Sequence, residues 1–285
     1  MIFFLDGYRV PSQLYIRGMT STFDTQARAI LDFYRNLRPR FTPGKGIDIM
    51  NPYEDRAVWE VVEKFYSKYY NDDRPRAFIF GINPGRHGAG VTGIPFTDPI
   101  RLAEKCGIAN GLQKRGELSS EFVYMVIEAF GGPEAFYGRY HFTALSPLGF
   151  VRDGKNLNYY DDKELMKAFE PFMLRCIRRQ LETMPAFPVC FCLGEGENFK
   201  YFSRVNERYR FFTEIIPLPH PRWVMQYRRK KVGEYVGLYV NKLNVKTNKD
   251  LSSWGNQFKA AIKAGDQPDK DLFDGLPNDF DSKEL

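Results

Sequence analysis

Two segments far apart in the sequence combine polar side chains with residues that shape the backbone. Residues 81–96 read Gly-Ile-Asn-Pro-Gly-Arg-His-Gly-Ala-Gly-Val-Thr-Gly-Ile-Pro-Phe, and residues 219–222 read Pro-His-Pro-Arg. The first segment holds five glycines and two prolines, a density typical of a backbone that approaches a ligand closely. It is not a Walker A loop, because no Gly-Lys-Ser/Thr follows, and its glycine spacing differs from the dinucleotide-binding pattern. We therefore expect a ligand site of another kind.

Strands and helices must bring these two segments together. Residues 77–80 form a continuous apolar run before the first segment, as in a buried parallel strand, and further strands are predicted at 141–148, 189–193 and 211–216. Helices are predicted at 22–37, 55–69, 120–130, 161–181, 196–205 and 226–243. This alternation predicts a three-layer α/β/α domain with a central, mainly parallel four-stranded sheet. Ligands of such sheets bind beyond the carboxyl ends of the strands, where both segments are expected to face one pocket.

Composition narrows the possible partners. The chain has 41 Lys and Arg against 35 Asp and Glu, a formal net charge of +6 that is compatible with a polyanionic partner. No apolar stretch is as long as the roughly 18 residues that a membrane-spanning helix needs, and the N-terminus lacks a signal-peptide pattern. We therefore expect a cytoplasmic protein without membrane contact. The four cysteines include no Cys-x-x-Cys pair, and we expect reduced thiols, no metal and no cofactor.

The residue order within the two segments resembles the active-site motifs of the uracil-DNA glycosylase superfamily. The closest resemblance is to the single-strand-selective monofunctional (SMUG) family, which has Gly-Met-Asn-Pro-Gly and then Thr-Gly-Val-Pro-Phe at this spacing. The mismatch-specific branch has Asn-Pro-Ser in its second motif, whereas here that motif begins with His220. The resemblance extends over about 48–242 and implies a glycosylase-like domain over 1–245. The polar residues 246–285 are expected to form a loosely docked or disordered tail.

The resemblance implies a monofunctional DNA glycosylase of base-excision repair. Such an enzyme takes a flipped nucleotide and hydrolyses the N-glycosidic bond of uracil, and here also of 5-substituted uracil or other deaminated bases. Asn83 matches the asparagine that orients the attacking water, and His220 matches the histidine that hydrogen-bonds O2 of the departing base. Phe96 matches the aromatic residue that stacks on the base. No Lys or Cys nucleophile is implied, so no lyase step is expected.

The residues that the resemblance places around the base are Gly85, Phe96, Ile82, Ser146 and Asn156. Gly85 stands where thymine-excluding members carry a tyrosine, which leaves room beside C5 of a pyrimidine. Ala144 stands where the family has the asparagine that reads the Watson–Crick edge of uracil. Thr143, Ser146 or Asn156 could substitute for that asparagine, and the preferred base is open between uracil and a deaminated purine such as xanthine.

The second segment departs from the family's His-Pro-Ser-Pro-Arg, because Arg222 and Trp223 follow Pro221 directly. We expect Arg222, assisted by Trp223 or Tyr227, to fill the vacated base stack. The run Arg228, Arg229, Lys230 and Lys231 is expected to contact phosphates of single- or double-stranded DNA. A monomer is expected.

Two other functions fit the same sequence. The first is a nucleic-acid-binding relative of the same fold with weak or no excision activity, which Ala144 favours. The second is an α/β enzyme that acts on free nucleosides or nucleotides, which would not need the cationic run at 228–231.

Overall fold

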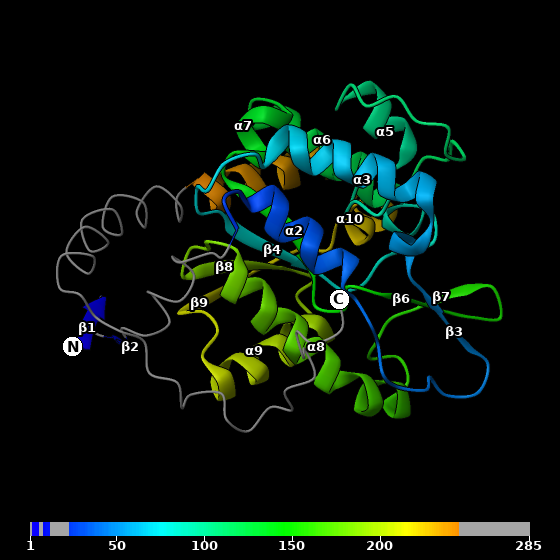
Figure 1. The fold of residues 1–285 in the computed structure, drawn as a ribbon. Helices are drawn as coiled ribbons and strands as arrows, with labels where there is room; N and C mark the ends of the chain where they lie inside the picture. The colour runs from blue at the N-terminus through cyan, green and yellow to red at the C-terminus, as the bar shows by residue number, and fades with distance from the viewer. Residues whose placement is uncertain (1, 6–7, 12–22, 245–285) are drawn as a thin grey trace.

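A parallel four-stranded sheet forms the centre of the computed structural model, which describes residues 2–5, 8–11 and 23–244 (Figure 1). Its strands, in the order in which they pair, are β5 (Tyr140–Ala144), β4 (Ala77–Gly81), β8 (Val189–Leu193) and β9 (Glu214–Leu218). Every pair is parallel, with Gly81 opposite Ala144 and Leu193 opposite Leu218. All four strands therefore end at one edge of the sheet, and the predicted α/β class is confirmed.

Helices cover both faces of this sheet. The helices on the first face are α2 (Gln26–Arg35), α3 (Arg56–Tyr69), α8 (Lys163–Thr183) and α9 (Glu197–Tyr209), which lie in front of the sheet in Figure 1. The helices on the other side are α6 (Leu118–Ala129), α7 (Pro133–Tyr137), α10 (Pro221–Tyr227) and a helix over 232–244. Short helices α4 (Ala89–Thr92) and α5 (Pro99–Glu104) join β4 to α6. No helix of the described residues is long and apolar enough to cross a membrane.

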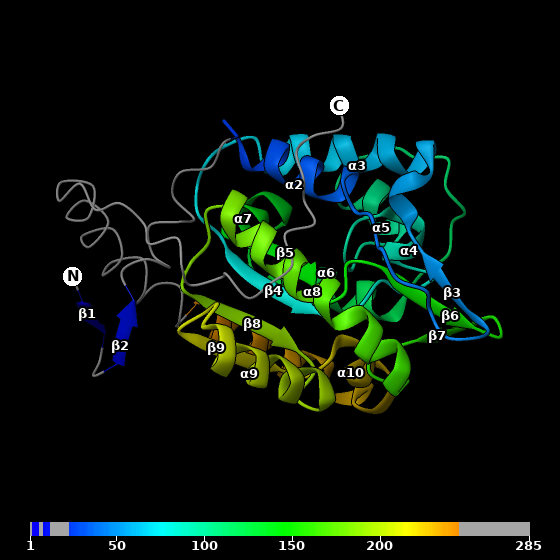
Figure 2. The ribbon, with the colours of Figure 1, turned by 60° about the horizontal axis from the view of Figure 1, so that its bottom comes forward.

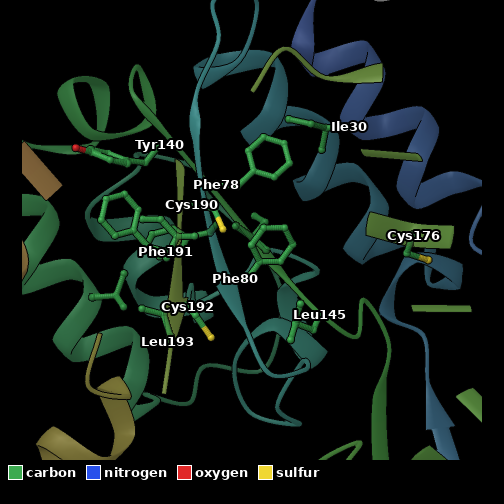
Figure 3. Packing of buried hydrophobic residues seen from close by; sticks show 14 of the residues in the cluster. Ile30, Phe78, Phe80, Tyr140, Leu145, Cys176, Cys190, Phe191, Cys192 and Leu193 are labelled. Carbon is green, nitrogen blue, oxygen red and sulfur yellow. The ribbon is translucent and has the colours of Figure 1, made fainter. Parts of the chain in front are cut away.

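Alternating side chains of the strands divide the core into two layers. Phe78 and Phe80 of β4 point toward the first group of helices, where the ring of Phe80 lies 4.8 Å from that of Phe202 in α9. Phe142 of β5 points the other way and stacks on Phe136 of α7, with ring centroids 5.3 Å apart. Figure 3 shows Phe78 and Phe80 on the side of Ile30 and Cys176, with Tyr140 and Phe191 on the opposite side. Both faces of the sheet are buried, which explains why the two central strands, β4 and β8, are continuous apolar runs.

Capping residues define where the helices begin, and they correct two predicted boundaries. The carboxylate of Asp55 accepts from the backbone N–H groups of Ala57 and Val58, so α3 begins as predicted. Helix α8 begins later than predicted, because Asp162 rather than Asp161 caps it. The final predicted helix is also divided: α10 starts at Pro221, ends at Tyr227, and is followed by a 3₁₀ turn, η2 (Arg229–Lys231). Proline at the first helical position favours this early start.

A second, antiparallel sheet lies beyond the carboxyl ends of the parallel strands (Figure 2). Its strands pair in the order β3 (Ile47–Met50), β6 (Gly149–Arg152) and β7 (Lys155–Leu157), and the 3₁₀ turn η1 (Pro52–Glu54) follows β3. The sequence predicted one strand over 141–148, whereas β5 ends at Ala144 and β6 is separate. Met50 fills the space between Gly90 and Gly149, because a Cβ on either glycine would collide with its thioether. The second sheet is thereby fixed against the loop after β4.

At the N-terminus, β1 (Ile2–Leu5) and β2 (Tyr8–Pro11) form an antiparallel pair. The predicted tail at 246–285 lies outside the described residues.

His141 is a buried titratable group that should make the stability of the fold depend on pH. Its ring lies 5.0 Å from that of Phe78 and 5.4 Å from that of Tyr70, and neither ring nitrogen has a hydrogen-bond partner among the described residues. Burial, reinforced by the positive charge of Arg76, lowers the pKa of His141 to about 3. The unfolded chain therefore binds a proton at this residue below about pH 6.5, while the folded chain does not.

We predict that His141→Phe weakens the loss of stability in acid. Because the folded pKa is depressed, the wild type should lose ~2 kcal/mol of unfolding free energy at this residue between pH 7 and pH 5. Phenylalanine keeps an aromatic ring without the proton, so the variant should lose about that much less over the same interval. Urea unfolding at the two pH values measures the difference. An equal loss in both proteins would contradict the assigned pKa.

Candidate functional site

A cavity of about 590 Å³ lies at the edge of the sheet where the parallel strands end. It is lined by the loop after β4, the ends of β5 and β7, the turn between β8 and α9, and the first residues of α10. Both of the segments singled out in the sequence contribute to it, so their predicted convergence is confirmed. A volume in this range suits a small ligand such as a nucleobase.

Asn83 lies in this cavity with both ends of its amide held by the backbone that follows β7. Its Nδ2 donates to the carbonyl of Leu157 at 3.3 Å, and its Oδ1 accepts from the N–H of Tyr159 at 3.2 Å. The side chain is half-buried. A carbonyl oxygen has two lone pairs, so Oδ1 can still accept a second hydrogen bond, for example from a water. The amide is thus a fixed acceptor in the cavity wall.

His220 follows β9 and caps the N-terminus of α10. Its Nδ1 accepts from the N–H of Arg222 at 3.2 Å, which places the proton of the neutral ring on Nε2. Burial, with the nearby positive charge of Arg222, lowers the pKa of His220 to about 4. At neutral pH the residue is therefore an uncharged imidazole with one donor, Nε2–H.

The helix over 232–244 holds the strand end that carries His220. The hydroxyl of Tyr239 donates to the carbonyl of Pro219, and Nζ of Lys242 donates to the carbonyl of Pro217 at 2.9 Å. Tyr239 is buried, with its ring edge against Phe122 of α6. This anchoring could not be predicted from the sequence, because it depends on contacts between segments that are not adjacent along the chain.

Phe96 forms a flat wall of the cavity through an unusual backbone conformation. Its φ of 54° lies in the left-handed region, which costs a non-glycine residue on the order of 1–3 kcal/mol. The ring packs against Gly81, where a Cβ would stand 2.8 Å from Cζ of Phe96, and lies 5.2 Å from the ring of Phe142. The glycine at the end of β4 therefore allows the ring to reach the edge of the sheet.

Gly85 and Asn156 form a polar corner of the cavity. A Cβ at Gly85 would stand 3.5 Å from Nδ2 of Asn156, an ordinary contact, so packing does not require glycine there. Oδ1 of Asn156 accepts from the N–H of Arg86 at 3.1 Å, and the Arg86 guanidinium donates to the carbonyl of Gly154. These bonds orient the Asn156 amide, and no described residue accepts a hydrogen bond from its Nδ2.

The structure places the remaining predicted base contacts differently. Ile82 and Ala144 line the cavity. Ser146, which was predicted as a base contact, is fully buried, is not among the lining residues, and donates to the carbonyl of Leu148 at 2.5 Å. Thr143 lines the cavity, but its hydroxyl donates to Oε1 of Gln180 at 2.7 Å. Of the three candidates to replace the asparagine missing at Ala144, Asn156 alone presents a free amide donor among the described residues.

The rim of the cavity carries exposed aromatic and cationic side chains. Arg222, Trp223 and Tyr227 line it, with Trp223 38% and Tyr227 66% exposed. The guanidinium of Arg228 lies 4.8 Å above the Trp223 ring. The cationic run continues past the end of α10, outside the cavity lining, and all four of its side chains are exposed.

The members of this cationic run differ in their partners. Arg229 pairs with Glu121 at 2.9 Å, and Lys231 pairs with Glu234 at 3.4 Å. Lys230 forms no ion pair with any residue that the structure describes. The sequence predicted one continuous helix here, whereas α10 ends at Tyr227 and the 3₁₀ turn η2 follows it.

Several residues that line the cavity were not predicted from the sequence, namely Glu117, Asn158, Tyr160, Glu195, Glu197 and Asn198. Glu117 caps α6, since its carboxylate accepts from the N–H of Ser120 at 2.9 Å. A glutamate three residues before Ser120 is a weak capping signal that could have located this helix start but not its place in the cavity. Within residues 23–244 and the N-terminal strand pair, no cluster of His, Cys, Asp or Glu is arranged to hold a metal ion.

Comparison with known proteins agrees with this geometry. The model of the uracil DNA glycosylase superfamily matches residues 67–244, a range that contains all four parallel strands and both cavity segments. The crystal structure of wild-type SMUG2 from Pedobacter heparinus is similar with a TM-score of 0.77 and 42% sequence identity, over 79% of this chain and 100% of that one. A search of curated proteins gave no match. The chain belongs to the uracil-DNA glycosylase superfamily.

Proposed function

We propose that this protein is a monofunctional DNA glycosylase that hydrolyses the N-glycosidic bond of uracil and related deaminated bases in DNA. One observation carries the proposal: a backbone-held amide acceptor, Asn83, and a neutral imidazole donor, His220, line the same cavity. Membership of the superfamily supports the reaction class, and the likeness to SMUG2 supports the branch.

His220 and Asn83 suit the two requirements of the hydrolysis, which are stabilising the departing base and positioning the attacking water. As the bond between C1′ and the base nitrogen breaks, its electron pair leaves with the base and positive charge builds on the sugar. Nε2–H of His220 would donate to the carbonyl oxygen of the departing anion, and because the ring is neutral it needs no prior protonation. Oδ1 of Asn83 would accept from a water whose oxygen then bonds to C1′, and the proton that this water loses would pass through solvent to the departing base anion. Asparagine orients the water without serving as a strong base.

The polar corner of the cavity favours deaminated bases. Deamination replaces an amino group, which donates, by a carbonyl, which accepts. Nδ2 of Asn156 offers a donor beside the open space at Gly85, so a carbonyl there gains a hydrogen bond whereas an amino group meets another donor. Uracil and xanthine both carry such a carbonyl, and Phe96 would stack on either ring.

The rim supports DNA as the polymer that carries the base. Trp223 and Tyr227 offer exposed rings for stacking on a neighbouring base, and Arg222 lies beside them with a cationic head that can face a phosphate. A binding protein without efficient excision is the second candidate, favoured by Ala144 in place of an amide. Formation of abasic sites separates the two candidates.

We predict that Asn83→Ala and His220→Ala each lower excision on the order of 10²–10³-fold, because each removes a preorganised group of the transition state. The assay measures abasic sites in single- and double-stranded oligonucleotides that carry uracil, xanthine or hypoxanthine. Asn36→Ala, at the exposed end of α2, is the matched control and should retain wild-type rates. Retained activity in both site variants would reject the site, and DNA binding without abasic sites in the wild type would favour the binding protein.

A substitution at Gly85 tests the space beside the base. The wild type should excise 5-hydroxymethyluracil as well as uracil, because no side chain at Gly85 fills the region beside C5. Gly85→Tyr should lower excision of 5-hydroxymethyluracil at least about tenfold more than that of uracil, while Gly85→Ala, whose Cβ fits at 3.5 Å from Asn156, should change little. Wild-type protein that removes uracil but not 5-hydroxymethyluracil would contradict the pocket assignment.

The salt dependence of DNA binding tests the rim. Each phosphate contact contributes about −0.9 to the slope of log K against log salt concentration. Arg222→Gln should make this slope shallower by about one, because the residue lines the cavity. Lys231→Gln should change it less, since its ammonium already pairs with Glu234. Equal slopes for the wild type and Arg222→Gln, measured by fluorescence anisotropy, would remove Arg222 from the DNA interface.

A further inference from the structure

A chain of buried hydrogen bonds continues from Asn83 into the core. Oδ1 of Asn83 accepts from the backbone N–H of Tyr159, and the hydroxyl of the same Tyr159 donates to Oδ1 of Asn198 at 2.9 Å. Nδ2 of Asn198 donates to the carbonyl of Leu193 at 3.2 Å and contacts Sγ of Cys192 at 3.3 Å. Tyr159 and Asn198 are 0% and 1% exposed. The chain thus joins the loop after β4, the segment after β7 and the end of β8.

We propose that Tyr159 and Asn198 are positioning residues that set the orientation of the Asn83 amide by tying the segment at 157–159 to the end of β8. This inference rests on the proposed function, because it assigns Asn83 a part in the reaction.

The segment that holds Asn83 needs such an anchor. Strand β7 is at the edge of its sheet and, in the described part of the chain, pairs with β6 alone. The turn before it and most of the strand are exposed, from Asp153 to Asn156. Tyr159 is the residue of this segment whose side chain enters the core, where its ring lies 5.4 Å from that of Tyr201. Burial raises the pKa of Tyr159 far above its usual value, so its hydroxyl keeps the proton that it donates.

The series of hydrogen bonds that begins at Asn83 ends close to His220. Gly194, directly after β8, has a φ of 109°, and a Cβ there would stand 3.8 Å from both Cβ of Asn198 and Cδ2 of His220. The N–H of Gly194 also donates to the carbonyl of Leu218 at 2.8 Å, two residues before His220. Gly194 is therefore a neighbour of both Asn198 and His220, so the hydrogen bonds that begin at Asn83 end close to the second proposed catalytic group.

The substitution Tyr159→Phe tests the inference, because it keeps the buried ring and removes only the hydroxyl. We expect kcat for uracil excision to fall on the order of 10-fold, since small displacements of a positioning group slow a reaction strongly, while KM stays within about twofold. Tyr70→Phe is the matched control: its buried hydroxyl donates to the carbonyl of Tyr140 at 3.1 Å, at the opposite end of β5 from the cavity. The control should lose similar stability and retain kcat.

A double variant shows whether Tyr159 acts through Asn83. In the Asn83→Ala background, Tyr159→Phe should cause no further fall in kcat, because the amide that it orients is absent. Independent, multiplying effects of the two substitutions would overturn the inference, and so would an unchanged kcat in Tyr159→Phe.

Amide hydrogen exchange gives a readout that does not need activity. The N–H of Tyr159 donates to Asn83, so its exchange should become about tenfold faster in Tyr159→Phe and stay unchanged in Tyr70→Phe. If the wild type excises no base, the proposed function fails, yet faster exchange in Tyr159→Phe would still support the anchoring of the segment. Unchanged exchange in that variant would overturn the anchoring itself.

Discussion

The parallel register of the four central strands is the constraint on which the site depends. Gly81, Ala144, Leu193 and Leu218 end at one edge because every neighbouring pair runs in the same direction. Parallel strands need helical crossovers on both faces, which bury the sheet and leave its carboxyl edge as the place where loops from distant parts of the chain meet. The cavity follows from this arrangement: most of its lining residues lie at or after the ends of strands, and the start of α6 adds Glu117 and Ser119.

Within the cavity, side chains divide their hydrogen-bonding groups between the backbone of the fold and the cavity itself. His220 uses Nδ1 to cap α10, which leaves Nε2–H. Asn156 uses Oδ1 to hold the N–H of Arg86, which leaves Nδ2. Asn83 uses its Nδ2 and one lone pair of Oδ1 on the backbone, which leaves the other lone pair. In each case the bond to the backbone determines both the direction of the remaining group and whether it donates or accepts.

The parts that could be predicted from sequence are those with a strong local signal. Strands β4 and β8 are unbroken apolar runs, and the glycine-rich loop keeps a recognisable residue order around Asn83. Strand β7 has three residues, two of them exposed, and no such signal. The motif that aligns Ser146 does not give the direction of its side chain, and in the structure its hydroxyl donates to the carbonyl of Leu148, two residues away. The link from Tyr159 to Asn198 could not be predicted, since neither residue stands in a motif.

The position of β9 has a consequence for the synthesis of the protein. In the described sheet β9 is an edge strand that pairs with β8, and Tyr239 and Lys242 hold its end from the helix over 232–244. Chains are made from the N-terminus, and a domain folds as a unit once its parts are available. A ribosome-bound chain that has exposed β4 and its loop therefore has Asn83 but no placed His220. A chain cut short before residue 239 lacks the hydrogen bonds from Tyr239 and Lys242 that hold the end of β9.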